Sequence, residues 1–180
     1  MADDDKAAKH PKDVMTCISE QISDLSAGDR AALRRIFLTR RHEADGIVIG
    51  LINGAGLNIP SDPKFFAPWR LLTHVGAILS GTARHKPHAP NGNVGSLLFA
   101  AGYSENRLLR LVSARSIALH GQIIRAVRSL PRAKDPPINS VNLWTLFHLA
   151  GPDPDRAEEA RTRIAQDYYT AVARSEGDSK

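Results

Sequence analysis

The sequence contains very little cysteine. Cys17 is the only cysteine in 180 residues, so the chain forms no internal disulfide and has no cysteine partners for a thiolate metal cluster. This composition is typical of a protein from a reducing compartment. Because Cys17 lies among helical apolar residues with no basic neighbour to activate it, we expect a small buried apolar group rather than a nucleophile.

Long apolar runs are also missing. The most apolar stretch, residues 46–59, is interrupted by asparagine and glycine and is shorter than the roughly 20 residues that a membrane-spanning helix needs. Residues 1–13 are acidic and then basic, and no apolar stretch follows them as it does in a secretory signal. We therefore expect a cytoplasmic protein that makes no contact with a membrane.

The motifs that carry common enzyme chemistry do not occur. There is no Gly-x-x-x-x-Gly-Lys-Ser/Thr phosphate loop and no Gly-x-Ser-x-Gly nucleophile elbow. His85 and His88 have a spacing that metal ligands use, but the region supplies no carboxylate to complete a site. Glu105 is the only acid in residues 63–134, too few for a Mg²⁺-dependent nuclease. We expect no catalytic residue, no cofactor and no metal.

Acidic residues are scarce in the middle of the chain. Residues 30–134 hold sixteen Lys or Arg against four Asp or Glu, a balance of +12. The flanking residues 1–29 and 135–180 are acidic, with balances of −4 and −3. The formal net charge of +5 therefore hides a strongly segregated charge distribution.

Clustered positive charge raises the free energy of a folded chain unless an anion screens it. Thirteen of the sixteen basic residues are arginine, whose planar guanidinium suits bidentate phosphate contacts and stacking on bases. Nucleic acid is the partner that this composition favours. An acidic protein partner, or no partner at all, remains open from the charge count alone.

The hydrophobic periodicity predicts an all-α fold. Apolar residues recur at spacings of three and four along most of the chain, and no stretch alternates as a half-buried strand does. Residues 42–63 have weak periodicity and are either a loop or a short helix. The predicted helices cover residues 13–25, 63–79, 94–101, 117–130 and 141–149, and others begin after Ser26, Ser104 and Asp153.

These elements suggest two packed helical bundles, which is within reach of a chain of this length. The first bundle spans residues 13–82 and the second spans residues 93–174. A basic loop, residues 83–92, joins them. We expect the N-terminal residues 1–12 and the C-terminal residues 175–180 to be disordered.

Helical spacing also groups several arginines. Arg107 and Arg110 share one edge of the helix that follows Ser104. Arg125 and Arg128 lie together on the side opposite the apolar stripe of their helix, where both can reach one phosphate backbone. Arg30 and Arg34 both fall outside the apolar face of the helix that follows Ser26.

Three segments form a recognisable series. The first is NVGSLLFAAGYSENRLLRLVSARSIALHGQIIRAVRSL, residues 93–130, with a short helix, a glycine turn and an Arg- and Leu-rich helix. The second is LSAGDRAALRRIF, residues 25–37, and the third is RIAQDYYTAV, residues 163–172. These segments, about half the chain, resemble the CasB family, the small subunit of type I-E CRISPR Cascade complexes. Residues 40–64 match no family pattern.

The resemblance implies an all-helical, non-catalytic subunit, present in two copies, that holds CRISPR RNA and target DNA and guides the displaced single strand. The implied partners are these nucleic acids, the large and backbone subunits of the complex, and a second copy of the chain. A free-standing helical transcription regulator and an adaptor for an acidic protein remain the alternatives. The candidate nucleic-acid-binding residues are Arg34, Arg35, Arg84, Lys86, Arg107, Arg110, Arg125 and Arg128.

Overall fold

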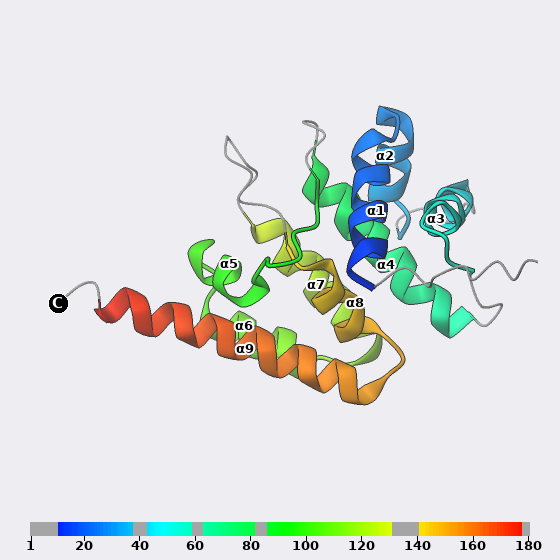
Figure 1. Cartoon of the computed structure of the whole chain (residues 1–180). Helices are drawn as coiled ribbons and strands as arrows, with labels where there is room; N and C mark the ends of the chain where they lie inside the picture. Colours follow the sequence, from blue (N-terminus) through cyan, green and yellow to red (C-terminus); the bar gives the residue numbers. More distant parts are fainter. Residues whose placement is uncertain (1–10, 38–42, 59–62, 82–85, 131–140, 178–180) are drawn as a thin grey trace, which may run out of the picture.

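The computed structural model describes residues 11–37, 43–58, 63–81, 86–130 and 141–177, and its regular secondary structure is entirely α-helical within these ranges (Figure 1). The predicted all-α fold is confirmed. The helices are α1 (Pro11–Asp24), α2 (Ala27–Arg34), α3 (Glu43–Gly54), α4 (Pro63–Ser80), α5 (Val94–Ala100), α6 (Glu105–Ser113), α7 (Ser116–Ser129), α8 (Leu143–Ala150) and α9 (Pro154–Gly177). None of the described helices is long and apolar enough to cross a membrane.

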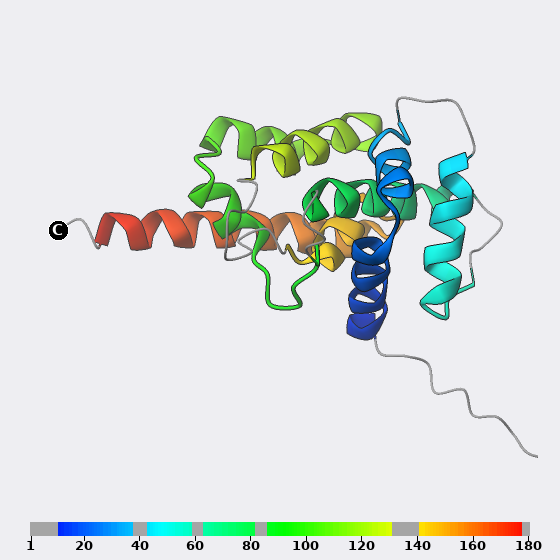
Figure 2. The same cartoon turned by 90° about the horizontal axis from the view of Figure 1, so that it is seen from above.

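Helix α4 lies at the centre of the molecule. It packs against α1, α2 and α3 on one side and against α7 and α8 on the other. The long helix α9 packs against α5, α6 and α8, and Figure 2 shows α3 and the C-terminal end of α9 at opposite ends of the molecule. Buried apolar side chains from these elements form a hydrophobic core that includes Ile18, Leu72 and Ile123. The division into two bundles stays a prediction.

Several helix ends are stabilised where the sequence predicted caps. The Ser26 hydroxyl accepts a hydrogen bond of 3.0 Å from the backbone N–H of Asp29. The Asp153 carboxylate accepts hydrogen bonds from the N–H groups that begin α9. Gly102 adopts φ +70° after α5, a conformation that glycine reaches at little energetic cost. Ser104 precedes α6 as predicted, but its side chain makes no capping bond.

Three expected boundaries need correction. The ambiguous residues 42–63 contain a regular twelve-residue helix, α3, because packing of buried residues such as Val48 outweighs the low helix propensity of its glycines. Helix α1 begins at Pro11, since proline is well suited to the first helical position. Helix α9 continues to Gly177 rather than ending at Arg174, because each added residue gains a backbone hydrogen bond.

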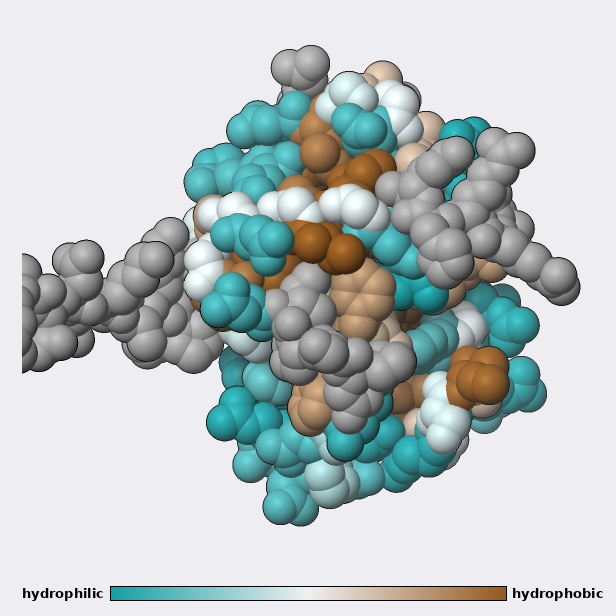
Figure 3. Space-filling model, turned by 90° about the vertical axis from the view of Figure 1, so that its right-hand side faces the viewer, coloured by the Kyte–Doolittle hydropathy of each residue, from teal (hydrophilic) through white to brown (hydrophobic). Residues whose placement is uncertain are grey.

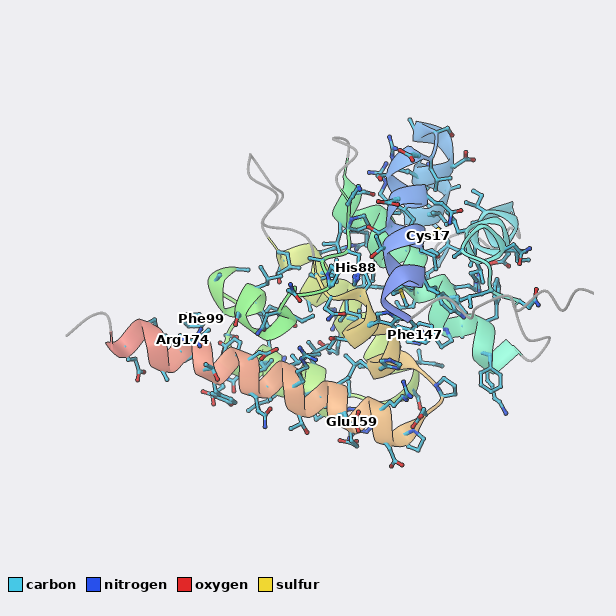
Figure 4. The ribbon with its side chains drawn as sticks, viewed as in Figure 1. Cys17, His88, Phe99, Phe147, Glu159 and Arg174 are labelled. Carbon is cyan, nitrogen blue, oxygen red and sulfur yellow. The ribbon has the colours of Figure 1, made fainter. Side chains whose placement is uncertain are left out.

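Two side chains differ from their predicted environments. Arg30 is not on the surface: it is 5% exposed, and its Nη1 donates to the Ser23 and Leu25 carbonyl oxygens at 2.9 and 2.6 Å. It therefore satisfies carbonyl groups at the end of α1, which would otherwise lack partners. Cys17 is only partly buried and packs against the core between α1 and α3, with its Sγ 3.8 Å from the Gly54 carbonyl oxygen (Figure 4).

Helix α5 approaches α9 so closely that one position admits only glycine. A Cβ added at Gly95 would collide with the Ile164 carbonyl oxygen and lie 2.6 Å from the backbone nitrogen of Tyr168. Next to it, the Ser96 hydroxyl donates to the Asp167 carbonyl oxygen at 3.1 Å. The Phe99 ring packs edge-on against Tyr168 with centroids 5.7 Å apart (Figure 4). The glycine thus allows the two backbones to meet.

We predict that Gly95→Ala lowers the free energy of unfolding by about 1–3 kcal/mol, because the new methyl group meets backbone atoms that cannot turn aside. Chemical denaturation followed by circular dichroism measures this. Gly121→Ala is the matched control, since a Cβ there meets nothing within 4 Å; it should be neutral or stabilise by about 0.5–1 kcal/mol. Equal effects of the two substitutions would contradict the close packing.

His88 joins three segments that are distant in the sequence (Figure 4). Its backbone N–H donates to the Ser19 hydroxyl at 3.0 Å, and its Nδ1 accepts from the backbone N–H of Leu143 at 3.2 Å. Backbone bonds between Val141 and the residues on either side of His88 complete the connection. Burial lowers the pKa of His88 below the ordinary value of 6.5, an effect that the backbone hydrogen bond with Val141 partly opposes.

We predict that the protein loses stability as the pH falls below about 6.5, the ordinary histidine pKa. The unfolded chain then binds protons that the folded chain excludes, and a proton on Nδ1 removes the acceptor for Leu143. Thermal melting from neutral to mildly acidic pH measures the effect. His88→Gln should weaken the pH dependence, and an unchanged dependence would show that His88 does not titrate there.

Candidate nucleic-acid interface

Helix α6 presents two arginines on its exposed side. Leu108 and Leu111 are completely buried, and this anchors one face of the helix in the core. Arg107 and Arg110 lie on the edge beside this face, are exposed, and are three residues apart. The predicted grouping of these two side chains on one edge is therefore what the helix geometry produces.

Helix α7 presents a second pair in the same way. Its inward face consists of Leu119, Ile123, Ala126 and Val127, all buried. Arg125 and Arg128 are exposed on the outer face.

The four arginines of α6 and α7 line one groove. This groove has a volume of about 480 Å³, and no carboxylate lines it. Tertiary packing thus brings together two pairs that the sequence places on separate helices. The residues that line it are Tyr103, Arg107, Arg110, Gln122, Arg125, Arg128 and Ser129, which we call the arginine groove.

None of the four guanidinium groups forms a hydrogen bond or an ion pair within the described part of the chain. Other basic residues of the central region do have acidic partners: Arg70 pairs with Asp45 at 2.8 Å, and Arg115 pairs with Glu158 at 2.8 Å. The positive charge of the arginine groove is therefore left unneutralised. An anion in the groove would gain charge-assisted hydrogen bonds and relieve the mutual repulsion.

Sequence reasoning missed the polar residues between the arginines. Gln122 lies three residues before Arg125, so the same helical spacing could have found it. Tyr103 comes from the turn before α6, and its backbone carbonyl accepts a bond of 2.6 Å from the Tyr168 hydroxyl. Burial raises the pKa of Tyr103, while the charges of Arg107 and Arg125 oppose this rise, so the phenol keeps its proton near neutral pH.

Arg34 and Arg35 lie at the C-terminal end of α2 and do not line the arginine groove. The Nε of Arg34 donates to the carbonyl oxygen of Arg30 at 3.3 Å. The Phe37 ring lies 6.3 Å from the His120 ring, which places the end of α2 beside the start of α7. These two candidates are therefore near one of the groove helices but outside the groove itself.

The loop candidates fall elsewhere. Lys86 is exposed, and its Nζ forms an ion pair of 2.7 Å with Glu20 on α1, so its charge is already compensated. It does not line the arginine groove. Arg84 lies outside the described residues, as does His85. Within the described ranges, His, Cys, Asp and Glu side chains form no group of three that could hold a metal ion.

No family model, curated protein or solved structure matches this chain.

We predict that the double substitution Arg107→Ala with Arg110→Ala leaves the fold intact and raises the free energy of unfolding by about 0.2–0.5 kcal/mol at low ionic strength. The reason is that these side chains have no partner among the described residues and repel the neighbouring arginines. Added salt should then stabilise the wild type more than the variant. Arg115→Ala is the control: it removes an ion pair and should not stabilise. A destabilised double variant would contradict the absence of internal partners.

Proposed function

We propose that the chain is a non-catalytic nucleic-acid-binding subunit that holds phosphate groups in the arginine groove. One observation supports this most strongly: within the described part of the chain, four guanidinium groups without a partner line a single groove, and no carboxylate lines it. Two consecutive phosphates of one strand present anionic oxygens that paired guanidinium groups bind well. The groove therefore suits a nucleic-acid backbone better than an isolated small anion.

The proposed binding does not depend on base sequence. Arginine side chains that contact phosphates position a strand but carry no sequence information. Among the described residues that line the groove, Tyr103 alone is aromatic, and it is 4% exposed, so it offers little surface for stacking on bases. We expect affinity to come mainly from release of counterions and to fall steeply as salt rises.

We further propose that this subunit acts in a type I-E Cascade complex in the cytoplasm. The longest resembling segment, residues 93–130, contains α5, α6 and α7 and carries all four groove arginines. In such a complex base pairing reads the sequence, and the protein needs only to hold backbones. Its partners would be CRISPR RNA, target DNA with its displaced strand, the large and backbone subunits, and a second copy.

The first test is binding of a labelled single-stranded DNA oligonucleotide, followed by fluorescence anisotropy over a range of salt concentrations. We predict that Arg107→Ala with Arg110→Ala weakens binding and reduces the slope of log affinity against log salt by about 1.4, since each lost phosphate contact contributes about 0.7. The control is Arg163→Ala with Arg174→Ala, which removes the same charge from exposed positions on α9.

Three outcomes would contradict the proposal. Equal weakening by the α9 control would show that net charge, rather than the arginine groove, controls binding. Salt-insensitive binding to one duplex sequence would favour the transcription regulator, which reads bases in the major groove. Absence of nucleic-acid binding at moderate salt would favour an adaptor for an acidic protein.

The Cascade assignment needs its own experiment. The chain is co-expressed with the candidate Cascade subunits and a CRISPR RNA, and target-strand loading is compared with and without it. We expect two copies to co-purify and the groove double variant to shorten the lifetime of the R-loop. A chain that binds DNA but stays apart from the complex would remove the assignment and leave phosphate binding in place.

A further inference from the structure

Helix α3 has a face that no other described element covers. Its opposite face carries the buried residues Ala44, Val48, Leu51, Ile52 and Ala55, which pack towards α1, α2 and α4. A helix that is apolar on nearly all sides is normally buried on all sides. Yet Ile49 is 42% exposed, and a Cβ added at Gly46 or Gly50 would meet nothing within 4 Å.

Figure 3 looks onto the side of the molecule where α3 lies and shows brown apolar surface among the polar residues. A groove of about 450 Å³ runs between α1, α2 and α3 on this side. Leu25, Ile47 and Leu51 provide its apolar walls, and Gly50 opens it towards the uncovered face of α3. We call this the α3 groove.

The charge at the α3 groove is opposite to that of the arginine groove. Asp24 and Asp29 line it, and no basic side chain of the described residues does. Asp24 is exposed and makes no ion pair within the described residues, while Asp29 bonds there only to the uncharged Ser26. Two carboxylates without a cationic partner in the described part of the chain repel nucleic-acid phosphates and attract a cationic group. The occupant that fits is therefore a basic segment of a protein.

We propose that the α3 groove is a docking site for an amphipathic helix of a partner protein, one with an apolar stripe flanked by lysine or arginine. The apolar stripe would cover Leu25, Ile47 and Leu51, as in other grooves that receive a helix. The flanking cations would reach Asp24 and Asp29. The glycines of α3 present no side chains, which lets a second helix backbone come close.

A second copy of this chain is a less suitable occupant. Exposed apolar and basic residues occur together on α6, where Leu109 is 47% exposed beside Arg107 and Arg110, and on α7, where Ile117 is 88% exposed and Arg125 and Arg128 are exposed. In the proposed function those arginines bind phosphates and are therefore not free to bind the α3 groove of a second copy. This step of the argument rests on the proposed function. A different protein can fill the α3 groove while the arginine groove holds nucleic acid.

The experiment uses the full chain labelled with ¹⁵N and a synthetic helical peptide with a leucine and alanine stripe flanked by lysines. The matched control peptide carries glutamate in place of each lysine. We expect the lysine peptide alone to shift the backbone amide signals of α3, including Gly46 and Gly50, in a saturable titration. Asp24→Asn with Asp29→Asn should weaken binding roughly tenfold, since each removes a charge but keeps the side-chain shape.

Gly50→Leu provides the steric test. The new side chain has room in the free protein but occupies the space that the partner helix needs, so peptide binding should be lost. Gly121→Leu is the matched control, because Gly121 is also an exposed helical glycine with nothing within 4 Å of its Cβ position. Gly50→Leu should bind single-stranded DNA as the wild type does, because Gly50 does not line the arginine groove, and this separates the proposal from the proposed function.

Several results would overturn the proposal. A lysine peptide that produces no shifts at α3 would do so, as would a glutamate peptide that binds equally well. Peptide binding that survives Gly50→Leu would place the contact elsewhere. Self-association of the wild type in sedimentation, lost in Gly50→Leu, would show that the occupant is a second copy rather than a different protein.

Discussion

The four arginines of the arginine groove repel one another, and the apolar packing beneath α6 and α7 holds them together. Leu108 and Leu111 fix one helix, and buried residues such as Ile123 fix the other. Fully burying each of these side chains contributes roughly 1.5–3 kcal/mol, whereas like-charge pairs on a helix cost only about 0.2–0.5 kcal/mol. The core can therefore hold the guanidinium groups in a fixed array before any anion arrives.

Contacts made by helix α9 help to position the edge of the arginine groove. Gly95 lets α5 lie against the α9 backbone, and the Tyr168 hydroxyl holds the carbonyl oxygen of Tyr103 in the turn that leads to α6. The position of α6, and with it the first pair of arginines, thus depends on contacts made by α9. A long helix whose exposed side is rich in charged residues has its structural role on the side that faces α5 and α6.

The sequence predicted those features that depend on neighbours within a few residues. The caps at Ser26 and Asp153, and the pairing of Arg107 with Arg110, follow from local spacing. Arg30 was misjudged because its partners, the carbonyls of α1, come from another element. The ion pair of Lys86 with Glu20 also joins distant parts of the sequence, so local spacing could not predict it. No helical wheel reveals that α6 and α7 lie side by side, so the shared groove needed the structure.

Basic and acidic residues that are segregated along the sequence are only partly segregated in the folded structure. Lys86 and Arg115 belong to the basic segment of the sequence, yet each is neutralised by an acid from a flanking segment, Glu20 and Glu158. The acids thus remove positive charge from these two sites and leave it concentrated at α6 and α7. Asp24 and Asp29 line the α3 groove. The described surface therefore has one arginine-lined groove and one carboxylate-lined groove, and under the two proposals a phosphate backbone and a basic helix would bind at different places.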